Sequence, residues 1–265
     1  MANDERSTDD PVLLVDGIGV SFRGIRALDD VSFAVPSGGI TAVIGPNGAG
    51  KTTLFNCISG IYAHEGRVIL AGDDVSRLRA DRRAARGITR TFQTPVLIPE
   101  LTALDNVLIG AYPHTRGGVA GSMLRLRGVR ADEKRAREEA VELLERLHFP
   151  VSVDAPVGAL PHGDRRRVEV ARALIGRPKV LLLDEPAAGL GAEEAESLVE
   201  EVSAVGESRG STCILVEHDV ALVRRVARHV VVLDAGRLLA QGDPETVGRD
   251  PKVVAAYLGD DWAAA

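Results

Sequence analysis

The sequence predicts an α/β protein built around a mainly parallel sheet, with a smaller antiparallel β subdomain and an inserted helical subdomain. Three observations carry this prediction. From residue 164 onward, short apolar runs alternate with helical patterns, which is typical of a parallel sheet covered by helices. The first 70 residues are dominated by strand-like runs, and a turn at residues 234–236 predicts a β-hairpin. Between about residues 94 and 160, strand-like runs are scarce and helical patterns prevail.

The first part of the chain contains four short runs rich in Val, Ile and Leu that predict strands. These runs are residues 12–15, 31–35, 40–44 and 67–70. A glycine-rich segment follows the third run, and apolar residues then recur at helical spacing. These apolar residues are Leu54, Phe55, Ile58 and Ile61. Gly60 stands near the predicted end of this helix, where glycine suits a C-cap.

The middle of the chain predicts two helices, at residues 104–111 and 131–147, joined by a glycine-rich loop around residues 113–121. The second helix is strongly amphipathic, with an apolar stripe among Glu and Arg residues. The stripe consists of Ala136, Ala140, Val141, Leu143, Leu144 and Leu147. This segment therefore predicts a mostly helical insertion in the α/β domain.

The last third of the chain returns to alternating helices and strands. The predicted helices are residues 165–175, 192–208 and 220–227. The predicted strands are residues 180–183, 212–216, 229–233 and 237–240. The last two strands are joined by Asp234, Ala235 and Gly236, which predict a hairpin turn.

Composition excludes several classes of protein. Of the 265 residues, 45% are hydrophobic and 26% are charged, which is enough apolar material for a packed core and excludes global disorder. The apolar runs are strand-sized, so the chain is not expected to span a membrane, and the acidic, polar residues 1–10 do not predict a signal peptide. A net charge of −6 argues against a general nucleic-acid binder. Cys57 and Cys213 lie in apolar patterns without a CxxC motif, so the cytosol is the default compartment.

The glycine-rich segment fits the phosphate-binding pattern G-x-x-x-x-G-K-[ST]. Its residues are Gly45, Pro46, Asn47, Gly48, Ala49, Gly50, Lys51 and Thr52. Glycines let backbone N–H groups turn toward phosphate oxygens, and the N-terminus of the following helix adds its dipole. Lys51 can reach the β and γ phosphates, and the Thr52 hydroxyl can bind Mg²⁺. A glycine-rich turn could match by chance, but the chain has only four lysines, so a chance Gly-Lys pair would be rare.

Two carboxylates follow the most apolar predicted strand. Asp184 and Glu185 come directly after residues 180–183, at the carboxyl end where ligands bind in open α/β sheets. Asp184 would hold Mg²⁺ through water, and Glu185 would orient and polarise the attacking water. The alternative is that both carboxylates cap the next helix. The preceding phosphate-binding pattern favours the catalytic interpretation.

Two further polar residues have positions that suit a nucleotide site. His218 follows the strand at residues 212–216 and could contact a γ-phosphate oxygen. Gln93 lies where the α/β pattern gives way to the helical segment, and its amide could touch Mg²⁺ or water. Taken alone, His218 and Gln93 are each explained equally well or better as ordinary polar residues. The phosphate-binding pattern is what favours a functional role for His218.

Taken in order, these motifs resemble those of the ATP-binding subunits of ABC transporters over about residues 13–260. The family order is P-loop, glutamine loop, signature motif, Walker B strand, D-loop and switch histidine. The matches fall at residues 45–52, Gln93, 160–164, 181–185, 188–191 and His218. The resemblance implies a P-loop NTPase of the ABC ATPase type that binds ATP and Mg²⁺ and hydrolyses ATP in a head-to-tail dimer.

The resemblance also implies roles for individual residues. Glu185, His218 and Gln93 would take part in catalysis, and Mg²⁺ would be held by Thr52, Gln93 and Asp184. Thr53 would join the P-loop in binding the nucleotide, and Gly163 would do so in trans, toward ATP held by the other subunit. The implied division is a disordered leader (residues 1–10), a nucleotide-binding core with the β subdomain (11–93), the helical subdomain (94–160), the second half of the core (161–242) and a C-terminal helical tail (243–265).

Within the family, several stretches are most similar to the ATPases of branched-chain amino acid importers. These stretches are residues 44–56, 90–93, 185–190, 216–219 and 255–259, together with the long middle segment 113–130. The similarity implies a second ATPase subunit, two transmembrane permease subunits and, indirectly, an extracytoplasmic solute-binding protein, with no nucleic acid involved. It places the chain at the cytoplasmic face of the membrane as a peripheral subunit.

The sequence departs from the family pattern at three places. The signature is usually Leu-Ser-Gly-Gly-Gln, but Pro161 replaces the serine and Asp164 the glutamine, so a hydroxyl is lost and a like charge faces phosphate. Arg165–Arg167 are expected to offset that charge. Gly191 stands where the D-loop usually ends in Asp or Asn. The candidate for stacking on adenine is Phe22 in place of the usual Tyr, and a core position in a strand fits Phe22 about as well.

The sequence allows several competing functions. The first hypothesis is an ATP-hydrolysing motor for amino acid import. The alternative is a regulatory subunit with low turnover, because the departures lie on the face that would complete the partner's site. A urea or amide importer ATPase and a lipopolysaccharide exporter ATPase are near rivals. A soluble ABC ATPase acting on DNA or ribosomes fits the acidic charge balance less well.

Overall fold

The computed structural model describes residues 11–92, 96–111 and 127–256. The predicted leader at residues 1–10, the predicted loop at 113–121 and Gln93 lie outside the described residues. Within the described part, no helix is long and apolar enough to cross a bilayer.

The core of the molecule is a six-stranded sheet with the order β10-β9-β3-β8-β7-β6. Its strands are β3 (Ile40–Ile44), β6 (Ile88–Arg90), β7 (Val180–Asp184), β8 (Thr212–Val216), β9 (His229–Asp234) and β10 (Arg237–Gly242). All neighbours are parallel except β10, which pairs antiparallel with β9. Every residue of β3, β7 and β8 is buried, as expected for central strands that are covered on both faces.

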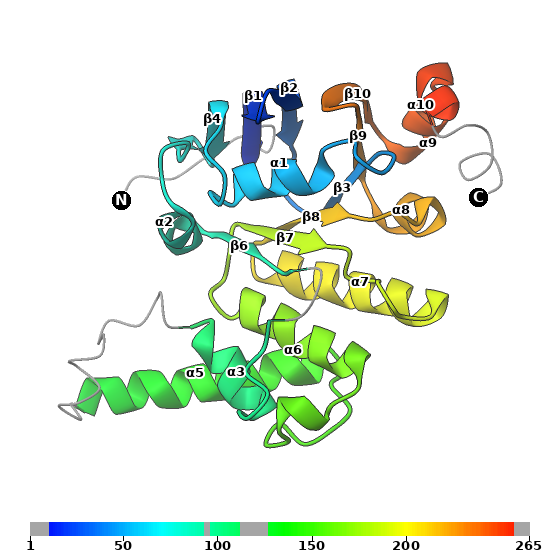
Figure 1. Cartoon of the computed structure of the whole chain (residues 1–265). Helices are drawn as coiled ribbons and strands as arrows, with labels where there is room; N and C mark the ends of the chain where they lie inside the picture. The colour runs from blue at the N-terminus through cyan, green and yellow to red at the C-terminus, as the bar shows by residue number, and fades with distance from the viewer. Residues whose placement is uncertain (1–10, 93–95, 112–126, 257–265) are drawn as a thin grey trace, which may run out of the picture.

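A second, antiparallel sheet has the order β2-β1-β4-β5. Its strands are β1 (Leu13–Phe22), β2 (Ile25–Val35), β4 (Glu65–Leu70) and β5 (Asp73–Asp74). Helix α1 (Lys51–Ile58) lies between this sheet and the parallel sheet (Figure 1). One hydrophobic cluster joins the three layers, with Leu54 and Phe55 of α1 packed among residues of both sheets. The antiparallel sheet therefore anchors the helix that follows the glycine-rich loop.

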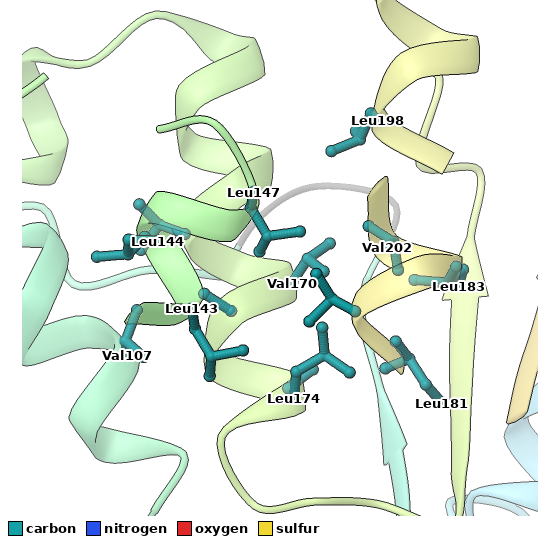
Figure 2. Close-up of a cluster of buried hydrophobic side chains, with 14 of the residues drawn as sticks. Val107, Leu143, Leu144, Leu147, Val170, Leu174, Leu181, Leu183, Leu198 and Val202 are labelled. Carbon is teal, nitrogen blue, oxygen red and sulfur yellow. The ribbon is translucent and has the colours of Figure 1, made fainter. Parts of the chain in front are cut away.

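The opposite face of the parallel sheet is covered by helices. Helices α6 (His162–Leu174) and α7 (Ala192–Ser208) lie against the sheet, and α3 (Ala103–Ile109) and α5 (Arg127–Arg146) pack on α6. In β7, Leu181 and Leu183 face this helical layer, whereas Val180 and Leu182 face α1, because alternate residues of a strand point to opposite faces. Figure 2 shows Leu143 of α5 and Leu147, which immediately follows that helix, packed with Val170 of α6. The helical segment is thus joined to the sheet by a continuous apolar core.

The remaining helices are short. They are α2 (Ala80–Arg86), α8 (Val220–Val226), α9 (Pro244–Gly248) and α10 (Pro251–Ala256), with a 3₁₀ turn at Val157–Ala159. Helices α8 and α9 begin with side-chain caps, in which Asp219 accepts from the Leu222 N–H and Asp243 accepts from the N–H groups of Glu245 and Thr246.

The predicted fold class is confirmed, and several boundaries need correction. Strands β1 and β2 extend well beyond the predicted runs at 12–15 and 31–35 and form a long hairpin. Helix α1 ends at Ile58, with Gly60 at φ +78° just after it, so Ile61 lies outside the helix and is 47% exposed. Helix α5 begins at residue 127 rather than 131. Helix α2 and strands β5 and β6 were not predicted, because their short, polar sequences carry no apolar periodicity.

Candidate nucleotide-binding site

The glycine-rich loop joins β3 to α1 in a conformation that requires glycine. Gly50 is the N-cap of α1 with φ +101°, and a Cβ there would lie 2.8 Å from a methyl carbon of Leu28. A Cβ at Gly45, which has φ +152°, would lie 2.1 Å from the carbonyl oxygen of Leu233. Both positions combine a positive φ with close contact, so a larger side chain would distort the loop. The predicted strand–loop–helix context of residues 45–52 is present.

Lys51 is the first residue of α1, and its side chain folds back over the loop. Its Nζ donates to the carbonyl oxygens of Gly45 at 2.6 Å and Pro46 at 3.1 Å. Burial lowers the pKa of Lys51, and the nearby Glu185 and Asp184 carboxylates oppose that shift. Lys51 is therefore close enough to the two predicted acidic residues for their charges to act on its pKa.

The C-terminal end of α1 is secured by an arginine that the sequence analysis missed. Arg83 is 1% exposed and donates to the carbonyl oxygens of Cys57 at 2.6 Å, Ile58 at 2.8 Å and Leu78 at 3.0 Å. Helix carbonyls at this end have no partner within the helix, and a cation is favoured there by the dipole. Arg83 thus fixes α1 from the end opposite the glycine-rich loop.

Asp184 is the last residue of β7 and is 4% exposed. Its Oδ2 accepts a hydrogen bond from Arg90 Nη2 at 2.7 Å, and its backbone N–H contacts the Thr91 hydroxyl at 3.3 Å. Arg90 and Thr91 were not predicted to belong to the site. Their partner lies 93–94 residues later in the chain, so only the pairing of β6 with β7 brings them together.

Glu185 and His218 meet although they follow different strands. His218 Nε2 lies 2.6 Å from Glu185 Oε1, and the Glu185 backbone N–H donates to the Val216 carbonyl oxygen at 3.0 Å. Glu185 adopts φ +47°, a conformation that is uncommon for a residue other than glycine and that concentrates at functional sites. The structure therefore brings together the carboxylate and the imidazole that the sequence marked separately.

Glu217 is a further buried carboxylate beside this pair. It is 5% exposed, and its Oε1 accepts from the Ala187 N–H at 3.0 Å. Burial raises the pKa of Glu217, and the hydrogen bonds from Ala187 and His218 oppose that shift. Glu217 thus links the loop after β8 to the turn after Glu185. The sequence showed it only as a neighbour of His218.

A fully buried ion pair on α6 holds the backbone around these residues. Arg166 and Glu169 have side chains 0% and 1% exposed, with Arg166 Nη1 at 2.7 Å from Glu169 Oε2. Arg166 also donates to the carbonyl oxygens of Phe92 at 2.5 Å and Glu185 at 2.7 Å. Glu169 Oε1 accepts from the Phe92 N–H at 2.9 Å. Phe92 immediately precedes Gln93, so this pair fixes the entry to the predicted glutamine loop.

The predicted signature segment forms the N-terminus of α6. Pro161 is the N-cap residue and offers no side-chain cap, because proline has no side-chain acceptor. Gly163 is covered by Glu194, whose Oε1 would lie 2.4 Å from a Cβ at that position. Burial raises the pKa of Asp164, Arg167 opposes the shift and Glu194 adds to it. Arg166 pairs with Glu169, whereas the charge of Arg167 lowers the pKa of Asp164, as expected of an arginine that offsets this carboxylate.

Two predicted residues remain at the periphery. Phe22 ends β1, is 42% exposed, and makes an edge-on contact with Tyr62 at 5.2 Å between ring centroids. Its exposure fits a ring available for stacking better than a core position. Gly191 is the N-cap of α7 and, like Pro161, contributes no side-chain cap.

The donor set suits Mg²⁺ bound together with a nucleotide. Among the described residues, no cluster of three or more His, Cys, Asp or Glu side chains could hold a metal ion unaided. Thr52, on the first turn of α1, is exposed, and Asp184 supplies a carboxylate. Mg²⁺ typically binds through one or two protein oxygens plus phosphate oxygens and water, so these residues fit the ion only when phosphates are present.

The comparisons with known proteins identify the class to which this fold and site belong. Residues 28–188 match the family described as ABC transporter, and residues 237–263 match the family described as branched-chain amino acid ATP-binding cassette transporter. The chain belongs to the ABC transporter family, whose ATP-binding subunits hydrolyse ATP.

Individual relatives narrow the likeness further. The chain is 37% identical to the high-affinity branched-chain amino acid transport ATP-binding protein BraF of Pseudomonas aeruginosa, over 94% of this chain and 98% of BraF. It is 36% identical, with the same coverage, to the corresponding protein LivG of Escherichia coli strain K12.

Solved structures agree with the fold. A nucleotide-free ATP-binding cassette from an ABC transporter superposes with a TM-score of 0.80 at 32% identity, covering 94% of this chain and 100% of the other. The ADP conformation of a cassette gives the same TM-score and identity, covering 94% and 99%. A dimeric cassette bound to ADP and phosphate gives a TM-score of 0.74 at 26% identity, covering 88% and 98%.

Proposed function

We propose that this chain is the ATP-hydrolysing subunit of an importer for branched-chain amino acids. The contact between Glu185 and His218 beside Asp184 carries the catalytic part of the proposal, because it places a base and its partner at the ends of adjacent parallel strands. The names of the relatives and the match at residues 237–263 support the solute class.

The chain's own residues divide the work of hydrolysis. The backbone of residues 45–50 and Lys51 bind the β and γ phosphates, and Thr53 supports them. Thr52 and Asp184, with Gln93, would hold Mg²⁺, and the ion would supply positive charge that neutralises the phosphate oxygens. Glu185 accepts a proton from the attacking water, and His218 orients the carboxylate and reaches the γ-phosphate. Phe22 stacks on adenine.

The assembly proposed is a head-to-tail dimer with a second ATPase subunit. In it, Gly163 at the N-terminus of α6 faces the nucleotide of the partner. The helical subdomain, residues 94–160, contacts two transmembrane permease subunits, and an extracytoplasmic binding protein delivers the solute. The chain then works at the cytoplasmic face of the membrane as a peripheral subunit.

Reconstitution tests this proposal. The chain would be purified with its permease subunits and binding protein, and ATPase activity would be measured with leucine, isoleucine, valine, urea and other solutes in turn. We expect stimulation by branched-chain amino acids and by no other solute class. Stimulation by urea or an amide alone would contradict the solute assignment.

The regulatory alternative rests on the N-terminus of α6. Pro161 supplies no cap there, and Asp164 and Glu194 bring negative charge to the face that would meet the partner's phosphate. This alternative predicts two unequal ATP sites. Replacing Lys51, and then the equivalent lysine of the partner subunit, would show it: unequal losses of ATPase activity would support a regulatory role, and equal losses would contradict it.

We expect Pro161→Ser to strengthen ATP binding across the dimer. A serine would cap α6 and offer a hydroxyl to phosphate, and a hydrogen bond to a charged group contributes about 1.5–3 kcal/mol. The ATP concentration for half-maximal dimer formation should fall at least about tenfold. Arg79→Ser is the matched control, because Arg79 is the uncapped N-cap residue of α2 and is not on α6. An equal effect of both substitutions would show that the gain is not specific to α6.

A further inference from the structure

Arg90 occupies a position that the proposed catalytic scheme does not use. It is the last residue of β6, and its side chain is 8% exposed. The guanidinium lies over two aromatic rings, 5.7 Å from the centroid of Phe55 and 5.5 Å from that of Phe92. Such stacking favours a cation and restricts the guanidinium plane. Arg90 is therefore held in place before any ligand binds.

The two ends of the guanidinium join two parts of the site. Nη2 donates to Asp184 Oδ2 at 2.7 Å, and Nη1 donates to Asn56 Oδ1 at 2.5 Å. Asn56 lies on α1 four residues after Thr52, so both project from the same face of that helix. Arg90 thus ties the Asp184 carboxylate to the helix face that carries the Thr52 hydroxyl. These are two of the proposed protein donors to Mg²⁺.

We propose that Arg90 is a positioning residue for the magnesium–nucleotide complex. It occupies Oδ2 of Asp184, leaves Oδ1 for the cation or its water, and sets the carboxylate relative to Thr52. The Asp184 backbone N–H donates at 3.3 Å to the hydroxyl of Thr91, the residue that follows β6, so two consecutive residues at the end of β6 hold both the side chain and the backbone of Asp184. This inference rests on the proposed function, because it concerns Mg²⁺ in the same site.

The geometry favours positioning over simple neutralisation of charge. A lone cation beside a metal ligand would repel Mg²⁺, whereas a planar guanidinium bonded to Asn56 and Asp184 together fixes a direction. Residues that orient metal ligands typically contribute about 10- to 100-fold to metal affinity. Loss of positioning would weaken Mg²⁺ binding, whereas loss of a repelling cation would strengthen it. A magnesium titration therefore separates the two roles.

The test is the binding of a fluorescent ATP analogue to the full chain as a function of free Mg²⁺. We expect Arg90→Met to bind the analogue without Mg²⁺ much as the parent does, and to need about 10- to 100-fold more Mg²⁺ for the magnesium-dependent increase. Arg90→Lys should fall between them, because an ammonium cannot bond Asn56 and Asp184 with the same planar geometry. Arg67→Met is the matched control, since Arg67 forms an exposed ion pair with Asp16.

A double-mutant cycle with Asp184→Asn separates positioning from a general structural role. If Arg90 acts through Asp184, adding Arg90→Met to Asp184→Asn should change the magnesium requirement by no more than about twofold. Additive shifts would contradict the proposal, as would a lower magnesium requirement in Arg90→Met. Thermal unfolding checks that each variant is folded, and Arg90→Lys carries the test if Arg90→Met is not. Failure of the parent chain to bind the analogue at all would overturn the proposed function instead.

Discussion

Glu185→Gln is expected to abolish most ATP turnover while leaving ATP bound. The amide has the size of the carboxylate and can still contact His218, whose Nε2 lies 2.6 Å from Glu185 Oε1. It cannot accept a proton from water, and loss of a general base typically lowers kcat by about 10²- to 10⁴-fold. Because the P-loop is unchanged, we expect ATP to accumulate in a closed dimer. Single-turnover kinetics and size-exclusion chromatography with ATP measure the two effects.

The control for this variant is Glu193→Gln, which alters an exposed carboxylate in the first turn of α7. It should leave kcat and the elution volume as in the parent. If Glu185→Gln hydrolyses ATP as fast as the parent, the assignment of Glu185 as the base is wrong. If it loses ATP binding as well, Glu185 supports the nucleotide pocket rather than the chemical step.

The central strands could be predicted because a strand that is buried on both faces has a nearly continuous apolar sequence. The runs that became β3, β7 and β8 are apolar at nearly every position, and every residue in them is buried. Strand β6 has no such apolar run. Its three residues are Ile88, Thr89 and Arg90, and the last two are shielded by partners far along the chain. A local hydrophobic pattern cannot predict a polar strand whose side chains find their partners only through tertiary contacts.

The same distinction holds within the site. Lys51, Asp184, Glu185 and His218 follow a loop or a strand end in recognisable patterns, so the sequence marks them directly. Arg166 stands in a run of three arginines that the sequence does not distinguish from one another. Its side chain is fully buried, whereas those of Arg165 and Arg167 donate to the carbonyl oxygens of Leu160 and Leu147. Only the packing of α6 against the end of β7 shows which arginine is structural.

Arg166→Met is expected to lower the free energy of unfolding by about 3–5 kcal/mol. The substitution leaves the Glu169 carboxylate buried without its cation, and removes donors to the carbonyl oxygens of Phe92 and Glu185. The cost of an uncompensated buried charge exceeds the apolar gain of methionine. Urea unfolding of the isolated chain measures the change. Arg225→Met is the control, because the Arg225 side chain is 45% exposed in its pair with Glu196 and should change stability by less than about 1 kcal/mol.

A double variant shows how much of that loss comes from the unpaired charge. Glu169→Met added to Arg166→Met removes the orphaned carboxylate, so stability should recover in part. Recovery should be incomplete, because the Phe92 N–H and the carbonyl oxygens that Arg166 satisfied are partly buried and lose these partners. ATPase activity should not return with stability, since the backbone of Phe92 and Glu185 is no longer fixed to α6. Full recovery of both would mean that the ion pair contributes neither hydrogen bonding nor orientation, and that α6 is held to the site by its apolar contacts alone.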